Sequence, residues 1–402
     1  MSQRSKHLLK SSILLKRLAI ITTHPIQYYA PAFKLLSESD QIDLKVFYTW
    51  GESSIKKYDR GFEKIIEWDI PLLDGYSYEF LQNSAKHLGT HHFNGIINPE
   101  SIQRINRFKP DALLIFGWGW HSHLKIIRHY KGQLPLWFRG DSTLLDDKPS
   151  VTNILRSAFL KLVYKHIDKA FYVGKSSKAY FLKNGLKEHQ LIFAPHAIDN
   201  SRFKADQNIE ANIIRQQLNI VDTDILVLFA GKLEPKKNPT ILLEAFIKIN
   251  KANLHLLFVG SGVLEGDLKS KARSSKSNNI YFIDFQNQQS LAVYYQACDL
   301  FCLPSKGPGE TWGLAVNEAM ACGKAVLVSD KVGCAADLVD HDVNGMIFHS
   351  TSIDDLEEKL THLLDKEKEG LKLMGQFSLK IIEKWTFANQ VKAIEKEILN
   401  LN

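Results

Sequence analysis

The chain of 402 residues has few cysteines, and their positions exclude a class of small secreted scaffolds. Its four cysteines are Cys298, Cys302, Cys322 and Cys334, and no two of them form a C-x-x-C pair. So few cysteines in a chain of this length cannot form a disulfide framework. All four lie in apolar surroundings, which favours buried, reduced thiols in a cytosolic protein.

The chain also lacks the long apolar stretch that a membrane-spanning helix needs. Such a helix takes about 20 consecutive apolar residues. Near the start the longest apolar run is Leu18–Ile21, and the apolar segment 11–15 is interrupted by Lys16 and Arg17. A secretory signal would also need a longer run and a small-residue cleavage site. We therefore expect a cytoplasmic protein.

Charge is distributed unevenly between the two halves. The formal charge of the chain is +7. Residues 1–200 carry 28 Lys and Arg against 18 Asp and Glu, a net +10, whereas residues 201–402 carry 23 against 26, a net −3. With 45% hydrophobic and 24% charged residues the composition is that of a globular protein, and the length predicts two or three domains.

Five cations and no acid lie in residues 1–17: Arg4, Lys6, Lys10, Lys16 and Arg17. This leader could attach the protein to the anionic inner face of the cell membrane, since apolar residues lie among its cations. A disordered basic leader explains the same pattern. No recognised nucleic-acid motif or repeat of basic and aromatic residues is present, so we expect no nucleic-acid partner.

Two series of short apolar runs alternate with helical patterns. Such alternation predicts parallel sheets covered by helices. The fold class is therefore α/β, with two doubly wound Rossmann-like domains facing each other across a cleft. In the first half the expected strands are 18–22, 44–48, 112–116, 134–138 and 170–173, and the expected helices are 30–36, 99–107, 123–130 and 152–166. In the second half the expected strands are 225–230, 254–259, 280–285, 300–303, 325–328 and 346–348, and the expected helices are 239–250, 264–271, 289–297, 314–321 and 353–364.

A basic loop follows the expected strand 225–230. It reads Gly231-Lys-Leu-Glu-Pro-Lys-Lys-Asn238 and leads into a helix. Phosphates bind where a parallel strand ends and a helix begins, and ammonium groups neutralise their charge. A solvated basic turn is the alternative.

A second loop follows the strand 300–303 and carries two carboxylates. It is rich in Gly and Pro, contains Glu310, and leads at Gly313 into a helix that contains Glu318. The free amides of a helix start favour an anion, while ionised carboxylates accept hydrogen bonds from sugar hydroxyls. Ordinary surface acids near a helix start are the alternative.

These motifs together resemble the GT-B glycosyltransferases of the GT4 type (glycosyl transferases group 1). The family shows Gly-Arg-Leu-(three residues)-Lys-Gly and Glu-x-Phe-Gly-(four residues)-Glu-Ala. Lys232 stands in place of Arg, Lys237 at the Lys, Trp312 in place of Phe, and Glu310 and Glu318 at the two acids. The linker Pro195–Asp199 resembles Pro-Asn-Gly-Val-Asp, with His196 for Asn. The likeness is dense over 195–365 and loose before it.

The resemblance implies which residues bind the donor. The two basic residues would hold the diphosphate, the first acid the sugar and the second the ribose. The implied donor-binding residues are Gly231, Lys232, Lys237, Gly260, Glu310, Thr311, Trp312, Gly313, Leu314 and Glu318. The implied catalytic residues are Glu310, Lys237, Lys232, Asp141 and His24. The implied domains are 1–197 for the acceptor and 198–380 for the nucleotide sugar, with a helix over 381–402 returning to the first domain.

The first half departs further from the family. Its first loop resembles that of a subgroup with His-Pro-Ile-Gln-Tyr, and we expect His24, Gln27 and Tyr28 on the acceptor side, although His24 could instead be a cap or turn residue. Arg139 occupies the position of the usual sugar-binding His. Asp141 could bind a hydroxyl or pair with Arg139. Trp120 and His121 could contact an acceptor sugar or pack internally.

The implied activity is transfer of a sugar from a nucleotide-diphosphate sugar to a glycan or lipid-linked acceptor, with retention, in surface polysaccharide or glycoconjugate synthesis. A nucleotide-sugar 2-epimerase on the same fold is the alternative. We expect no cofactor and no metal, because the pairs His91-His92 and His121-x-His123 lack acidic or cysteine partners at the spacing of strong metal sites.

Overall fold

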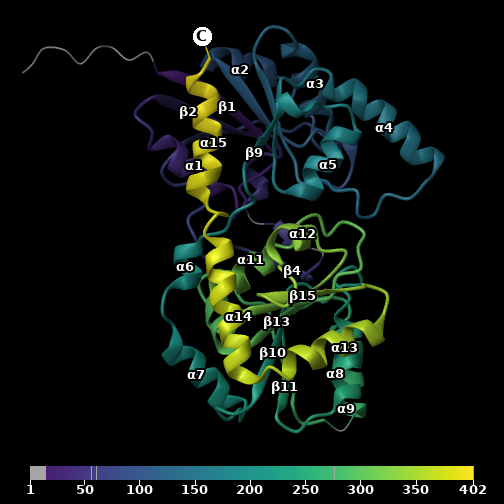
Figure 1. Cartoon of the computed structure of the whole chain (residues 1–402). Helices are drawn as coiled ribbons and strands as arrows, with labels where there is room; N and C mark the ends of the chain where they lie inside the picture. The colour runs from purple at the N-terminus through teal and green to yellow at the C-terminus, as the bar shows by residue number, and fades with distance from the viewer. Residues whose placement is uncertain (1–14, 56, 60, 276, 402) are drawn as a thin grey trace, which may run out of the picture.

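The computed structural model describes residues 15–55, 57–59, 61–275 and 277–401. It contains two parallel sheets, one in each half of the chain, covered by helices (Figure 1). The predicted fold class is confirmed. The predicted leader falls largely on residues 1–14, which lie outside the described residues.

The first sheet has the strand order β5-β2-β1-β6-β7-β8-β9. Its middle strands form because their apolar runs are buried on both faces, as in β6, where all five residues are buried. The strands are β1 (Lys16–Thr22), β2 (Ile42–Tyr48), β5 (Ser77–Phe80), β6 (Ala112–Phe116), β7 (Leu136–Arg139), β8 (Lys169–Tyr172) and β9 (Leu191–Phe193). The helices of this half are α1 (Ala30–Ser37), α2 (Ser101–Phe108), α3 (His121–Tyr130), α4 (Val151–Tyr164) and α5 (Lys175–Lys183).

The second sheet has the order β12-β11-β10-β13-β14-β15. The order reverses between β10 and β13, so the loops after these two strands diverge and leave a crevice at the carboxyl edge. The strands are β10 (Ile225–Ala230), β11 (Leu254–Val259), β12 (Ile280–Ile283), β13 (Leu300–Leu303), β14 (Ala325–Ser329) and β15 (Gly345–Phe348). The helices are α6 (Asn200–Lys204), α7 (Asn208–Gln217), α8 (Pro239–Ile249), α9 (Glu265–Ser274), α10 (Leu291–Ala297), α11 (Leu314–Ala321), α12 (Ala335–Leu338), α13 (Ile353–Leu364) and α14 (Glu367–Ile382).

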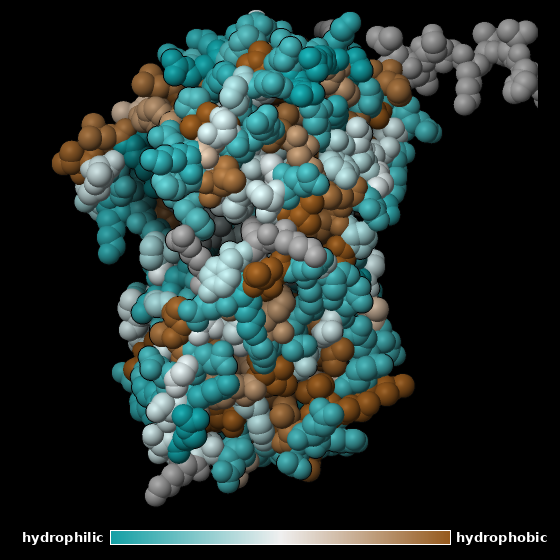
Figure 2. Space-filling view, turned by 180° about the vertical axis from the view of Figure 1, so that it is seen from behind, coloured by the Kyte–Doolittle hydropathy of each residue, from teal (hydrophilic) through white to brown (hydrophobic). Residues whose placement is uncertain are grey.

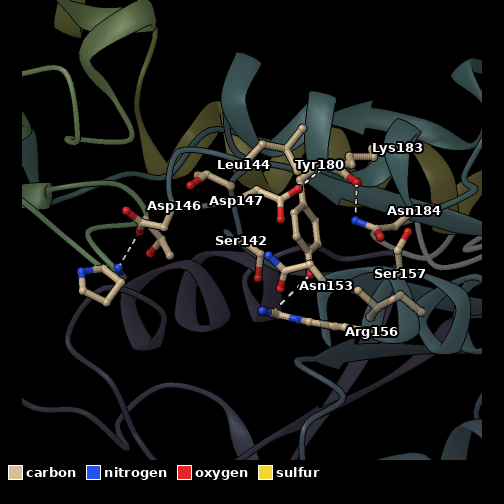
Figure 3. Close-up of a pocket in the computed structure, with 15 residues that line it drawn as sticks. Ser142, Leu144, Asp146, Asp147, Asn153, Arg156, Ser157, Tyr180, Lys183 and Asn184 are labelled. Carbon is tan, nitrogen blue, oxygen red and sulfur yellow. Dashed lines mark hydrogen bonds and ion pairs between the residues drawn. The ribbon is translucent and has the colours of Figure 1, made fainter. Parts of the chain in front are cut away.

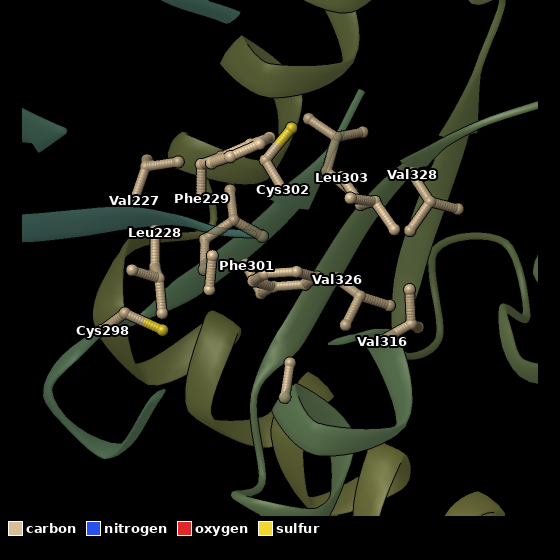
Figure 4. Close-up of a cluster of buried hydrophobic side chains, with 14 of the residues drawn as sticks. Val227, Leu228, Phe229, Cys298, Phe301, Cys302, Leu303, Val316, Val326 and Val328 are labelled. Carbon is tan, nitrogen blue, oxygen red and sulfur yellow. The ribbon is translucent and has the colours of Figure 1, made fainter. Parts of the chain in front are cut away.

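The core of the second half holds its loops in place. Phe229 of β10, Phe301 of β13 and Val326 of β14 are fully buried, and Val316 of α11 packs in the same cluster (Figure 4). The two motif loops therefore start from strands that are fixed on both faces. Among the described residues the four cysteines form no disulfide; Cys298, Cys302 and Cys334 are buried, as expected, whereas Cys322 is half-buried.

Two segments connect the halves besides the linker. The last helix, α15 (Phe387–Leu399), runs along α1 of the first half (Figure 1), where Val391, Ile394 and Ile398 join the core formed by β1 and β2. A hairpin of β3 (Lys57–Asp59) and β4 (Lys64–Ile66) extends from the first half toward the second. Its segment contacts the loops after β11 and β12.

Several elements were not predicted: the strands β3, β4, β5 and β9 and the helices α5, α6, α7 and α12. The strands are only three or four residues long, and none has a continuous run of buried residues that a sequence pattern would reveal. Within the described residues no helix combines the length and apolarity needed to cross a membrane.

Candidate functional site

A cavity of about 440 Å³ lies between the two halves, at the carboxyl edges of both sheets. All ten residues that the resemblance implies for the donor line it. From the first half it is lined by His24, Gln27, Tyr28 and Asp141, together with Asp59, Phe62 and Trp68 of the hairpin segment. The cavity therefore gathers residues that are far apart in the sequence, such as Tyr28 and Glu318, which are 290 positions apart.

The first motif loop approaches the next loop so closely that only glycine fits. A Cβ on Gly260 would lie 2.0 Å from the carbonyl oxygen of Gly231, and the φ of Gly260 is +139°. The close approach brings the amide groups after β10 and β11 to the same wall of the cavity. This close approach explains why a glycine directly follows Val259.

The two motif loops are joined by a buried ion pair. The Nζ of Lys237 lies 2.6 Å from Oε2 of Glu310, and Ser305 Oγ donates to the same oxygen at 3.0 Å. Burial alone would raise the pKa of Glu310, but the ammonium of Lys237 and the hydrogen bond from Ser305 outweigh it, so the pKa lies below its ordinary value. Glu310 is therefore an ionised acceptor at neutral pH.

Glu318 lies deeper, on α11, and is buried between two tyrosines. Tyr28 Oη donates to its Oε1 at 2.9 Å, and Tyr295 Oη donates to its Oε2 at 2.8 Å. Burial raises the pKa of Glu318, and the two hydroxyl bonds offset only part of that rise. Since Tyr28 belongs to the first half, its bond to Glu318 connects the two halves across the cavity.

Lys232 contacts the hairpin, which the sequence motifs did not reveal. Its Nζ lies 2.7 Å from Oδ1 of Asp59 and 5.0 Å from the centre of the Phe62 ring. Burial would raise the pKa of Asp59, but the hydrogen bond and charge of Lys232 lower it below its ordinary value. A carboxylate thus neutralises the cation that the resemblance assigns to the donor diphosphate.

The helix α11 begins at the cavity wall. Gly313, which precedes it, has φ +91°, and a Cβ there would lie 2.7 Å from Val332 Cγ1. The side chain of Trp312 is buried, and its Nε1 donates to Asn317 at 2.9 Å. The start of α11 therefore points free amide groups into the same cavity as Lys237, which suits an anion.

On the side of the first half, Asp141 and His24 both reach the cavity. Asp141 Oδ2 accepts a hydrogen bond from Thr311 at 2.7 Å, which joins it to the second motif loop. His24 Nδ1 lies 2.8 Å from Thr23 Oγ1, and its ring contacts Trp50 edge-on. Among the described residues no ion pair links Asp141 with Arg139.

Arg139, predicted to lie on the acceptor side, does not line the cavity. The side chain is buried, and its two Nη atoms donate to the carbonyl oxygens of Ala194 and Pro195 at 2.9 and 3.0 Å. Arg139 therefore binds the linker between the halves. Burial lowers its pKa to about 10, so it stays charged.

Trp120 and His121 also do not line the cavity. Trp120 Nε1 donates to the carbonyl of Thr90 at 3.3 Å, and the ring of His121 packs on Phe93. The loop that carries them packs on the 90–96 segment, so the alternative of internal packing holds for both. Among the described residues no group of three or more potential metal ligands is present.

A second cavity, of about 410 Å³, lies beside the first (Figure 3). It is lined by Asp146, Asp147, Asn153, Arg156 and Tyr180 of the first half, and by Pro308, Gly309 and Thr311 of the second motif loop. Asp146 Oδ2 accepts from the backbone N of Gly309 at 2.8 Å, which fixes the rim that the halves share. Thr311 lines both cavities.

Comparison with known proteins gives the arrangement a family context. Residues 210–377 match the family described as Glycosyl transferases group 1. An uncharacterized glycosyltransferase of Methanocaldococcus jannaschii is 24% identical over 295 residues, which are 64% of this chain and 81% of the relative. The N,N'-diacetylbacillosaminyl-diphospho-undecaprenol alpha-1,3-N-acetylgalactosaminyltransferase of Campylobacter jejuni is 26% identical over 56% of this chain and 59% of its own length.

The whole chain matches solved structures in fold. The crystal structure of Anabaena HepE in complex with UDP superposes with a TM-score of 0.72 at 18% identity, covering 96% of this chain and all of that one. The match extends over both sheets, whereas the sequence family covers the second half. The chain therefore has the GT-B fold, and its residues 210–377 match the glycosyl transferases group 1 family.

Proposed function

We propose that the chain is a retaining, GT4-type glycosyltransferase that moves a sugar, a hexose in our assignment, from a nucleotide-diphosphate sugar to a glycan or lipid-linked acceptor. The observation that carries the proposal is the gathering of two lysines, the start of α11 and two carboxylates around one cavity at the switch point of the second sheet. These groups suit a donor that contains both an anionic diphosphate and neutral hydroxyls. Cations and amides suit the diphosphate, and carboxylates suit the hydroxyls.

The leaving diphosphate sets the electrostatic requirement. When the bond to the sugar breaks, negative charge accumulates on the diphosphate oxygens. In our assignment Lys232, Lys237 and the amides before α11 stabilise that charge from fixed positions, which lowers the barrier without protein reorganisation. Glu310, ionised and held by Lys237, would accept hydrogen bonds from the donor sugar, and Glu318 from the ribose.

The nucleotide and acceptor are proposed from the relatives. HepE was solved with UDP, which favours a uridine donor. The Campylobacter jejuni relative is named for a lipid diphosphate acceptor, which favours a lipid-linked glycan and a place at the inner face of the cell membrane. Asp141 and His24 are the side chains of the first half that could contact the acceptor hydroxyl.

A transfer assay tests the proposal. The purified full-length chain is first screened with UDP-, GDP- and ADP-sugars for a thermal shift, and the stabilising donor is then incubated with lipid-linked and soluble glycan acceptors. We expect one donor class to bind and the product to keep the anomeric configuration by NMR. An inverted product would refute retention. Conversion of the nucleotide sugar without an acceptor would support the 2-epimerase instead.

A further inference from the structure

The helix α4 exposes an apolar face that the fold does not use. Five apolar side chains on it have exposed fractions between 43 and 73%: Val151, Ile154, Leu155, Phe159 and Leu162. They recur three or four residues apart, a spacing that places them on one side of a helix. The opposite side buries Leu160, Val163 and Tyr164 against the core. The apolar face is therefore available for something outside the chain.

The position of α4 exposes this face widely. The helix projects sideways from the first half (Figure 1). From behind, apolar side chains gather on that projecting edge at the upper left (Figure 2). Isolated exposed apolar residues are common on proteins, but a contiguous set of this kind marks an interaction surface.

The charged side chains of α4 itself are all cations, and the nearest acids in the sequence are Asp147 before it and Asp168 after it. Residues 148–167 contain Lys148, Arg156, Lys161 and Lys165 and no Asp or Glu. Lys161 and Lys165 are exposed, and at 100° per residue both lie on the Ile154 side of the apolar face. His166 lies among further cations, since burial and then the charges of Lys131, Lys165 and Arg128 lower its pKa. The surface is thus apolar, with two exposed lysines along one of its sides.

The inner side of α4 leads toward the proposed reaction site. Asn153, Arg156 and Ser157 of α4 line the second cavity, which ends at Thr311 (Figure 3). Thr311 also lines the interdomain cavity and bonds to Asp141. A substrate anchored beside α4 could therefore reach the proposed donor site along one continuous surface.

We propose that the apolar face of α4 inserts into the headgroup region of an anionic bilayer. Apolar side chains would enter the acyl boundary, while the bordering lysines contact anionic headgroups. This interface is separate from the basic leader, and it goes beyond the proposed sugar transfer. Its test measures membrane binding and does not depend on turnover. The membrane proposal can therefore fail while the transferase assignment stands, and the transferase assignment can fail while the membrane proposal stands.

The test is co-sedimentation of the full-length chain with vesicles of phosphatidylcholine alone or mixed with phosphatidylglycerol. We expect binding to the mixed vesicles that weakens in high salt. The variant Leu155→Ser/Leu162→Ser should bind at least about tenfold less, because two large apolar side chains no longer enter the bilayer. Lys161→Gln/Lys165→Gln should lose binding severalfold and become less salt-sensitive.

Two controls make the result specific. Ile209→Ser/Ile213→Ser changes two exposed apolar residues on α7 of the second half, and it should bind like the unaltered chain. Deletion of residues 1–14 separates the leader from α4, and it should leave most of the binding. Circular dichroism checks that each variant is folded.

Three results would overturn the proposal. The first is no binding of the unaltered chain to mixed vesicles, and the second is full binding by the α4 variant. The third is a dimer in sedimentation velocity that Leu155→Ser/Leu162→Ser converts to a monomer, since α4 would then contact a second copy.

Discussion

The two halves of the interdomain cavity are built differently. In the second half Lys237 and Ser305 both bond to Glu310, and each of the three lies on a loop that leaves a fully buried strand. In the first half the polar side chains after the strands are divided between the cavity and the scaffold. Asp141 reaches the cavity, whereas Arg139, two residues earlier, holds the linker. Chemistry is thus concentrated on one side and structural support on the other.

The bonds across the cavity show how the two halves are connected. Tyr28, Asp59 and Asp141 of the first half each bond to a group of the second that we assign to the donor or its loop: Glu318, Lys232 and Thr311. The first half therefore contacts the donor site mostly through groups that a bound donor would have to share or displace. The experiments below separate donor binding from support.

The largest effect is expected from the second half. Lys237→Ala should lower kcat by about 10²–10³, the usual loss when one preorganised group that stabilises the leaving charge is removed. The matched control is Lys306→Ala, which removes an exposed lysine near the same loop that does not line the cavity. Steady-state rates with the stabilising donor measure both, and thermal melting checks the fold.

Near-normal turnover in Lys237→Ala would contradict the donor assignment of the loop after β10. Glu310→Gln is a second test of the donor assignment, because it keeps the side-chain shape and removes the charge that holds Lys237. It should also lower kcat strongly, while the control stays within about twofold of the unaltered chain, as surface changes usually do.

The sequence revealed the second half of the site well, for a physical reason. Buried parallel strands are continuous apolar runs, so 225–230 and 300–303 were found residue for residue, and the loops after them must meet at the switch point. Gly231, Gly260 and Gly313 then follow from close backbone approach and positive φ. In this part of the site the sequence pattern of each strand and loop is enough to indicate where its residues lie in the fold.

The first half was predicted less completely because its contacts depend on tertiary structure. The hairpin strands β3 and β4 are three residues long, and the partner of Asp59 is 173 residues away. For Arg139, the sequence shows that it ends a strand but not that its side chain meets the linker. The carbonyl groups that Arg139 binds are 55 and 56 residues away, so no local pattern reveals the contact.

Arg139→Ala is expected to act on stability rather than on the acceptor. It removes two hydrogen bonds from a buried cation to the linker carbonyls, and such bonds contribute about 1.5–3 kcal/mol each. We expect a clearly lower melting temperature and an unchanged KM for the acceptor. Asp141→Ala is the matched variant. It should raise the KM for the acceptor and leave the melting temperature nearly unchanged. An acceptor KM that rises in Arg139→Ala at full stability would restore the original prediction for Arg139.

Acid should weaken the first half and the linker before the second half. Burial lowers the pKa of His123 and of His196 to about 4, so the folded chain binds fewer protons than the unfolded chain between pH 6.5 and about 4. Stability is therefore lost as pH falls through that window, by about 2 kcal/mol for each group at pH 5. Melting curves between pH 7.5 and 5 measure the loss.

His196→Asn sharpens this comparison. Nδ1 of His196 is buried without a hydrogen-bond partner among the described residues, and the side chain cannot take up a proton after the change to Asn. The variant should lose less stability between pH 7 and 5 than the unaltered chain. Identical slopes for the two proteins would show that His196 does not titrate in this window.

The smallest effect is expected at the contact between the hairpin and Lys232. If Lys232 binds the diphosphate, Asp59 competes with the donor, so Asp59→Asn should tighten donor binding. The gain should stay within about fivefold, because partly exposed ion pairs contribute at most about 1 kcal/mol. Asp284→Asn is the matched control, since it releases the hairpin residue Lys64 without touching Lys232. Titration calorimetry with the nucleotide sugar distinguishes the cases. Equal tightening in both variants would assign the effect to hairpin release, and weaker binding in Asp59→Asn would mean that Asp59 positions Lys232 for the donor rather than competing with it.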